Sequence, residues 1–309
     1  MRTIRTGHGQ GLWRARSASL ERKALEQAAA LLRRLGELLY GARLRLELAL
    51  VLRHFYRPRP DDIFLVTYPK SGTTLLQMML YQMTTRGEMD FPHINSVVPW
   101  IESLLNFPRW QELDSASSPR VFKSHLFYER LPSGAKLIYM ARDPRDVAVS
   151  AYHHQRTVLR RSGEMEAFVD SFLADRTSFG SWFRHIESWW PHRNDPGVLF
   201  LHYEDVIADL EGTVRRVSRF CGIPLDEADL PRIVERCGFE FMKRYNAKFD
   251  PRMLMAELGQ FIRRGGAGEG GSVFTPEQSR RLALRMQALA EKLGCSETEM
   301  LASPLRPPC

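Results

Sequence analysis

One short segment of the sequence combines a lysine with several hydroxyl side chains around a single glycine. It reads YPKSGTT and covers residues 68–74, directly after the apolar run 63–67 and before a stretch with helical periodicity. A helix that begins after a strand and a tight turn directs free backbone N–H groups and the positive end of its dipole at one point. The segment therefore predicts an anion site, to which Lys70 adds a positive charge.

This loop differs from the nucleotide-binding loops that work with magnesium. Those loops carry the pattern GxxxxGK[ST], in which the lysine follows the second glycine. Here Gly72 is the only glycine and Lys70 precedes it, which argues against a magnesium nucleotide. The alternative interpretation is a helix capped by the hydroxyl groups of Ser71, Thr73 and Thr74, without a ligand.

A second segment ends in a histidine close to a lysine. Lys123, Ser124 and His125 follow the short apolar run 121–122, and ligands of open α/β sheets bind outside the carboxyl ends of the strands. A neutral imidazole can remove a proton near pH 7, and a lysine can offset charge on a transferred group. The segment predicts a general base, although a single histidine is more often structural. We interpret five other histidines as structural: His93, His153, His154, His185 and His192.

Two further segments carry arginines. ARDPRDVAVS, residues 141–150, leads from a predicted strand into a helix that begins near its proline. Arg142 lies at the carboxyl end of this strand, where it could hold a second anion, and Ser150 lies about two turns along the helix. FIRRGGAGEGGSVFT, residues 261–275, predicts a mobile loop whose adjacent arginines close over a phosphate. The alternatives are an Asp-capped helix with surface arginines and a solvated loop.

The elements that would position these segments alternate along the chain. Apolar runs predict strands at 63–67, 121–122, 136–140 and 198–201, and longer periodic stretches predict helices at 74–85, 146–159, 166–190, 206–221 and 276–293. This alternation is typical of a three-layer α/β fold, in which helices cover both faces of a parallel sheet.

The net charge of +8 is unevenly distributed over the 309 residues. Residues 1–60 carry 13 Arg and Lys against four Glu, whereas residues 61–309 carry 31 basic and 32 acidic residues. A globular part near neutrality lacks the positive field that nucleic-acid binding requires, so we expect no nucleic-acid partner. The four cysteines lie far apart without a CxxC pair, which predicts neither a zinc site nor a disulfide framework and indicates a reducing compartment.

Residues 1–60 form a basic arm, which we separate from the main domain at 61–309. The sequence RPRP ends the arm at 57–60, and apolar residues recur at helical spacing over 19–50. We favour a helix packed on the domain over a helix on an acidic membrane surface, and no apolar run is long enough to span a membrane. The acid-poor stretch 1–18 predicts a disordered start, with a transit peptide as the alternative.

Together, the order and spacing of the four segments resemble the cytosolic sulfotransferase family from about residue 60 to residue 295. YPKSGTT matches the family's 5′-phosphosulfate loop, and KSH matches its KTH. ARDPRDVAVSAYHH matches its 3′-phosphate segment, and RRGGAGEGGSVFT is similar to its RKGxxGDWKxxFT. The resemblance implies a P-loop-like sulfotransferase fold, 3′-phosphoadenosine 5′-phosphosulfate (PAPS) as sulfate donor, and no metal.

The resemblance also implies a role for individual residues. His125 would be the general base, and Lys70 and Lys123 would stabilise charge on the leaving and transferring oxygens. The aromatic residues Tyr203 and Phe239 would contact the adenine. The full set of donor ligands would be Lys70, Ser71, Gly72, Thr73, Thr74, Arg142, Ser150, Tyr203, Phe239, Arg263, Arg264 and Gly265.

The chain departs from the family pattern in three places. Leu75 stands where the family has a tryptophan that stacks on the adenine, so the other two aromatic residues would carry more of the stacking. Gly270 and Gly271 replace a Trp and a Lys of the fourth motif, which predicts a looser loop. The family's dimerisation pattern KxxxTVxxxE is lost at 271–280, so we do not predict that dimer and make no prediction of the oligomeric state.

We predict a cytoplasmic sulfotransferase that acts on a hydroxyl, or an amine, of a small hydrophobic acceptor. The acceptor class follows from segments 91–110 and 158–182, which are rich in aromatic residues: Trp100, Phe107, Trp110, Phe168 and Phe172. Core packing is an equal alternative for each of these rings. Two other functions remain open, an ATP-dependent small-molecule kinase on a related fold and a nucleotide-binding scaffold without turnover.

Overall fold

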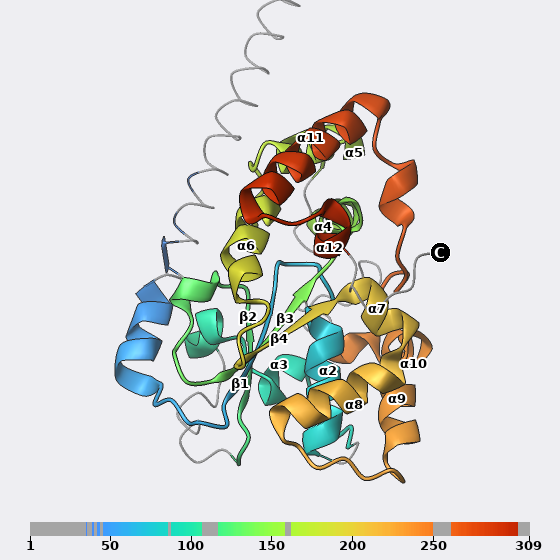
Figure 1. Ribbon diagram of the computed structural model, residues 1–309. Helices are drawn as coiled ribbons and strands as arrows, with labels where there is room; N and C mark the ends of the chain where they lie inside the picture. The colour runs from blue at the N-terminus through green and yellow to red at the C-terminus, as the bar shows by residue number, and fades with distance from the viewer. Residues whose placement is uncertain are drawn as a thin grey trace, which may run out of the picture.

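A four-stranded parallel sheet lies at the centre of the fold (Figure 1). The computed structural model describes residues 35, 39, 42–43, 46–85, 88–106, 117–157, 162–249 and 261–301. The strands are paired in the order β2-β1-β3-β4, and their bounds are β1 (Ile63–Thr67), β2 (Val121–Ser124), β3 (Lys136–Ala141) and β4 (Val198–His202). Each lies within two residues of a predicted strand, so the predicted parallel α/β sheet is confirmed.

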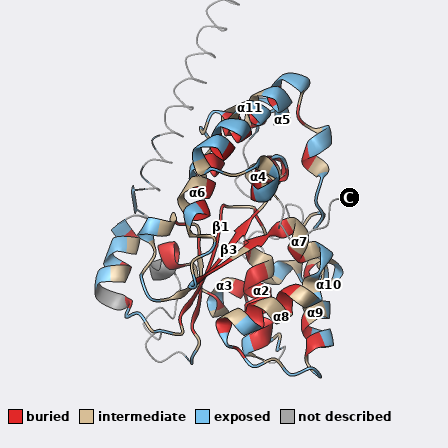
Figure 2. Cartoon of the chain, in the orientation of Figure 1, coloured by how far each residue is buried: buried red, intermediate tan, exposed pale blue. Residues whose placement is uncertain are grey.

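Alternate side chains of each strand enter two different cores. In β1, Phe64 and Val66 belong to one core, whereas Ile63 and Leu65 belong to the other. All five residues of β1 are buried and the first four are apolar, as expected for a strand that is covered on both faces. Figure 2 shows the buried strands enclosed by helices whose outer sides are exposed.

Helices from different parts of the chain cover the two faces. One core includes side chains of α2 (Thr73–Thr84), α8 (Leu210–Cys221) and α9 (Leu230–Cys237). The other includes side chains of α4 (Pro144–Thr157), α5 (Met165–Leu173), α6 (Trp182–Trp189) and α11 (Pro276–Leu293). The remaining helices are α3 (Ile94–Val97), α7 (Tyr203–Ala208), α10 (Phe239–Arg244) and α12 (Glu297–Leu301).

Two of the predicted helices are divided in the structure. The predicted helix 166–190 is α5 and α6, because the chain between them turns at Asp175 and Gly180, where φ is 56° and 75°. The predicted helix 206–221 is α7 and α8, because the side chain of Asp209 caps α8 and accepts a backbone hydrogen bond from its first turn. The other three predicted helices correspond to α2, α4 and α11 within two residues.

Most of the predicted arm lies outside the described residues, but its end packs on the domain. Val51 and Tyr56 are buried, and the Tyr56 ring makes edge contacts with Phe64 and Phe122 at 5.9 and 5.6 Å. This part of the arm therefore covers the sheet. Within the described residues, no helix is both long enough and apolar enough to cross a bilayer.

A buried ion pair ties the start of β1 to the start of β2. Arg120 donates to both carboxylate oxygens of Asp62 at 2.7 Å, and Tyr56 donates to the same carboxylate at 2.6 Å. The Arg120 and Asp62 side chains are only 2% and 0% exposed. Burial by itself would raise the pKa of Asp62, but the hydrogen bonds from Arg120 and Tyr56 lower it, so the carboxylate is charged.

Replacement of Arg120 by methionine should lower the free energy of unfolding by about 3–5 kcal/mol, because the charge of Asp62 would stay buried without its cation. Urea denaturation at pH 7 measures the change. Arg215→Met is the matched control, since Arg215 pairs with Glu227 at the surface, and it should leave the unfolding midpoint nearly unchanged. A similar loss in both variants would contradict a special role for the buried pair.

Candidate functional site

The loop after β1 ends at the N-terminus of α2. Gly72 precedes α2 with a φ of 92°, and a Cβ added there would lie 2.6 Å from the ring of Tyr203. Glycine is therefore required both by the backbone conformation and by the close approach of the ring. No side-chain hydrogen bond caps α2 within the described chain, so its first N–H groups are available to a ligand.

One cavity, with a volume of about 1290 Å³, collects the predicted side chains at the carboxyl edge of β1, β2 and β3. Six Lys and Arg side chains line it against two Glu side chains, which favours an anionic ligand. Of the predicted residues it is lined by Lys70, Gly72, Thr73, Thr74, Lys123, His125, Arg142, Ser150, Tyr203, Phe239, Arg263, Arg264 and Gly265.

Ser71 is the predicted ligand that does not line the cavity. It is fully buried, and its N–H donates to the carbonyl of Tyr68 at 3.2 Å. Its hydroxyl has no hydrogen-bond partner within the described chain. Lys70, Thr73 and Thr74 of the motif therefore line the cavity, whereas Ser71 is buried in the turn between them.

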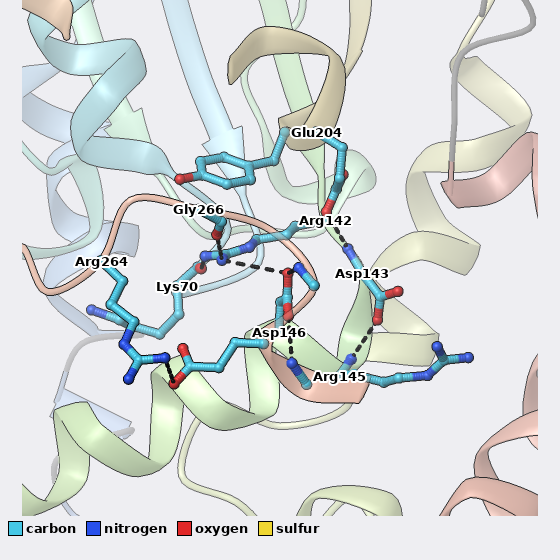
Figure 3. Close-up of polar contacts among 12 residues, drawn as sticks. Lys70, Arg142, Asp143, Arg145, Asp146, Glu204, Arg264 and Gly266 are labelled. Atoms are coloured by element: carbon cyan, nitrogen blue, oxygen red, sulfur yellow. Dashed lines mark hydrogen bonds and ion pairs between the residues drawn. The ribbon is translucent and has the colours of Figure 1, made fainter. Parts of the chain in front are cut away.

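Arg142 connects three parts of the site. Its guanidinium donates to the carbonyls of Lys70 and Gly266 at 3.1 and 3.0 Å, and it lies 3.8 Å from the carboxylate of Asp146 (Figure 3). The same group lies 4.2 Å from the centroid of the Tyr203 ring. Its Nε is buried and has no hydrogen-bond partner in the described residues.

The glycine-rich segment after residue 260 is anchored to α4. The carboxylate of Asp146 accepts hydrogen bonds from the N–H groups of Gly268 and Gly270, both at 2.8 Å. A Cβ at Gly270 would lie 2.3 Å from Cβ of Arg145, so the tryptophan of the family motif would not fit without a backbone shift. The sequence predicts a looser loop here, but the structure holds the described part of the segment in place.

Acidic and aromatic side chains contact the part of this segment that carries its two arginines. Arg263 and Arg264 both form ion pairs with Glu269; the dashed line at Arg264 in Figure 3 marks the contact of that residue. The Tyr203 hydroxyl donates to the carbonyl of Gly265 at 3.2 Å, and the Phe239 ring packs against the same glycine. The two aromatic residues predicted to contact adenine therefore both lie against Gly265.

His125 is held in one tautomer. Its Nδ1 lies 2.8 Å from the carbonyl of Thr67, and because a carbonyl can only accept, Nδ1 carries the proton and Nε2 is free to act as a base. Burial and the nearby charges of Lys123 and Lys70 hold the pKa of His125 well below 6.5, so the ring is neutral at neutral pH. Lys123 lies 5.0 Å from the ring centroid of Trp100, and burial lowers its pKa to about 8.

Several residues of the cavity were not predicted from the sequence. Glu102 accepts a hydrogen bond from the backbone N–H of His125 at 2.6 Å, and His154, interpreted as structural, lines the cavity. Glu102 belongs to none of the four motifs, whereas His154 is the last residue of the segment ARDPRDVAVSAYHH.

The predicted acceptor-pocket residues are distributed differently from the prediction. Trp100 lines the cavity as predicted. Phe168 and Phe172 do not line it: they pack on the core from α5, which was the alternative interpretation. Phe107 and Trp110 lie outside the described residues. Other apolar side chains take this place in the cavity wall: Ile94, Phe179, Phe249 and Phe261.

This geometry defines a class of α/β protein in which a glycine-containing loop after the first strand and an arginine after the third face one anion site at the switch point of the sheet. Residues 60–295 match the family described as Sulfotransferase domain. The chain belongs to this family, as its four segments predict, and it is a sulfotransferase.

Individual relatives support the assignment over most of the chain. Sulfotransferase 4A1 of Mus musculus is 36% identical over 236 residues, which cover 73% of this chain and 79% of that protein. The crystal structure of mouse sulfotransferase SULT7A1 complexed with PAP shows a TM-score of 0.65 and 31% identity, and covers 79% of this chain and 89% of that one. Retinol dehydratase, in complex with androsterone and the inactive cofactor PAP, shows a TM-score of 0.66 and 25% identity, with coverage of 85% and 88%.

Lys123 should titrate near pH 8, well below the usual pKa of a lysine, because burial disfavours its charged form. Its charge is therefore present at pH 7 and is lost as the pH rises through about 8. NMR of the protein after ¹³C-dimethylation of its lysines measures each titration, with Lys123→Met to assign the signal. A Lys123 signal that shifts only above pH 10 would show that the ammonium is well solvated.

Proposed function

We propose that the protein transfers a sulfuryl group from PAPS to a hydroxyl, or an amine, of a small hydrophobic acceptor. The observation that carries the proposal is the convergence of His125, Lys123 and the anion loop on one cavity. Support also comes from relatives whose structures hold PAP. The apolar part of the cavity wall suits a hydrophobic acceptor, and one such relative was crystallised with androsterone.

The residues present fit the donor. The uncapped N-terminus of α2 and the side chain of Lys70 suit its 5′-phosphosulfate, and the guanidinium of Arg142, which lines the same cavity, suits a further phosphate. Ser150 lines the same cavity from α4, and Tyr203 and Phe239 offer aromatic surfaces for the base. When bound, PAPS supplies an activated sulfuryl group.

Side chains of this protein remove the acceptor proton and stabilise the charge that develops during the transfer. The Nε2 atom of His125 takes the proton of the acceptor hydroxyl, and the bond from Nδ1 to Thr67 stabilises the imidazolium that forms. The ammonium groups of Lys70 and Lys123 offset negative charge that develops on the oxygens of the transferred group. Glu269 holds Arg263 and Arg264 near the cavity before the ligand arrives.

The proposal is tested by ligand stabilisation and by turnover. Adenosine 3′,5′-bisphosphate should raise the melting temperature, because a ligand that binds only the folded state stabilises it, whereas magnesium-ATP should not. Turnover with labelled PAPS should then appear with a panel of phenols, alcohols and amines. Stabilisation by magnesium-ATP alone would favour a kinase, and bisphosphate binding without turnover on any acceptor would favour a scaffold.

His125→Ala should lower kcat by roughly 10²- to 10⁴-fold, because the variant lacks the group that takes the acceptor proton. The dissociation constant of adenosine 3′,5′-bisphosphate, measured by calorimetry, should stay within a few fold. A variant that keeps a tenth of the wild-type rate would place the base elsewhere.

Arg142→Ala should weaken adenosine 3′,5′-bisphosphate by roughly ten-fold to over a hundred-fold, because charge-assisted bonds to phosphate contribute about 1.5 to 3 kcal/mol each. Adenosine 5′-phosphate, which has no 3′-phosphate, is the control and should bind equally weakly to both proteins. Arg264→Ala should lose less, since this side chain is 71% exposed. Equal losses for both nucleotides in Arg142→Ala would mean that Arg142 only supports the loops.

A further inference from the structure

His125 forms hydrogen bonds through its main chain as well as through its ring. It follows the last residue of β2, where the chain leaves the sheet without regular secondary structure. On one side of the residue, its N–H donates to Oε1 of Glu102 at 2.6 Å. On the other side, its carbonyl lies 3.2 Å from Nε2 of His185. Neither contact involves the imidazole of His125, which is bonded to Thr67.

The chemistry of the second contact fixes the state of His185. A carbonyl only accepts, so Nε2 of His185 carries the proton, and the unprotonated Nδ1 accepts the hydroxyl hydrogen of Tyr139 at 3.0 Å. Burial lowers the pKa of His185 to about 4, so the ring is neutral at neutral pH. The ring also stacks on Tyr139, with centroids 5.6 Å apart, and is 3% exposed.

Glu102 is brought to His125 by a pairing at the edge of the sheet. The N–H of Lys123 donates to the carbonyl of Pro99 at 2.8 Å, and Trp100 forms a parallel bridge with Lys123. The turn that follows this bridge carries Glu102, whose side chain is almost wholly buried. Its Oε1 is used by His125, and its Oε2 has no hydrogen-bond partner within the described chain.

We propose that Glu102 and His185 are positioning residues that clamp the main chain of His125 and so direct its Nε2 into the cavity. The inference rests on the proposed function, because it assigns a purpose to the geometry of the base. Misplacement of a reacting group by about 1 Å can cost roughly 10²-fold in rate. A base on a segment that has left its strand needs such support.

Matched variants separate positioning from other effects. Glu102→Met and His185→Phe keep most of the side-chain volume and remove the bond to His125. Glu102→Gln keeps an oxygen acceptor but not the charge, and His185→Gln keeps an N–H donor at a similar reach. Tyr139→Phe leaves the donor of His185 in place but removes the hydroxyl that selects its tautomer.

The kinetic readout is kcat against acceptor KM and bisphosphate affinity. Glu102→Met and His185→Phe should each lower kcat by roughly 10- to 100-fold, with the dissociation constant of adenosine 3′,5′-bisphosphate within about three-fold of wild type. Both Gln variants should retain at least about a third of kcat. Tyr139→Phe should lower kcat by a smaller factor. A loss in Glu102→Gln equal to that in Glu102→Met would overturn the clamp in favour of a role for the charge beside Lys123.

A second readout needs no turnover. In ¹⁵N-histidine-labelled protein at pH 7, the ring of His125, identified by its absence in His125→Ala, should show a single tautomer protonated at Nδ1. Glu102→Met and His185→Phe should move its ring shifts toward the average of the two tautomers. Unchanged shifts in both variants would overturn the clamp. A wild-type protein that shows no turnover would instead refute the proposed function and would leave this test intact.

Discussion

Three parallel strands end in step at one edge of the sheet, and the whole site depends on this constraint. Val66 of β1 pairs with Ser124 of β2, and Thr67 pairs with Met140 of β3. The chain therefore leaves the three strands at neighbouring points, with β1 in the middle. The register of the sheet therefore brings three segments together: the anion loop, the histidine segment and the arginine segment.

Main-chain groups hold these segments together more than side-chain pairs do. Arg142 binds the carbonyls of two different loops, Asp146 binds two N–H groups of the glycine-rich segment, and Tyr203 binds the carbonyl of Gly265. The clamp proposed for His125 follows the same pattern. Backbone groups without a partner are costly when buried, so each of these bonds both satisfies a backbone group of a loop and helps to fix that loop beside the cavity.

The electrostatic balance of the cavity has two parts. On one side, Glu269 pairs with two arginines, so their charges are compensated only in part and a phosphate would have to compete with a carboxylate. On the other side, burial lowers the pKa of Lys123 and the pKa of His125, so His125 is neutral at neutral pH. Glu102 acts in the opposite direction on Lys123 and raises its pKa. The cavity thus combines two arginines that share one carboxylate with a base that is unprotonated at neutral pH.

The sequence alone determined the strands, three of the helices, the family and the segments that line the cavity, because apolar runs, capping residues and short motifs are local signals. It could not determine the break between α5 and α6, which depends on the backbone at Asp175 and Gly180, or the complete burial of Ser71 in a motif whose Lys70 and Gly72 line the cavity. Glu102 and His185 could not be recognised either, because a side chain that bonds a distant backbone group leaves no pattern in the sequence. Only tertiary packing, through pairing at the edge of β2 and stacking on Tyr139, brings these two residues to His125.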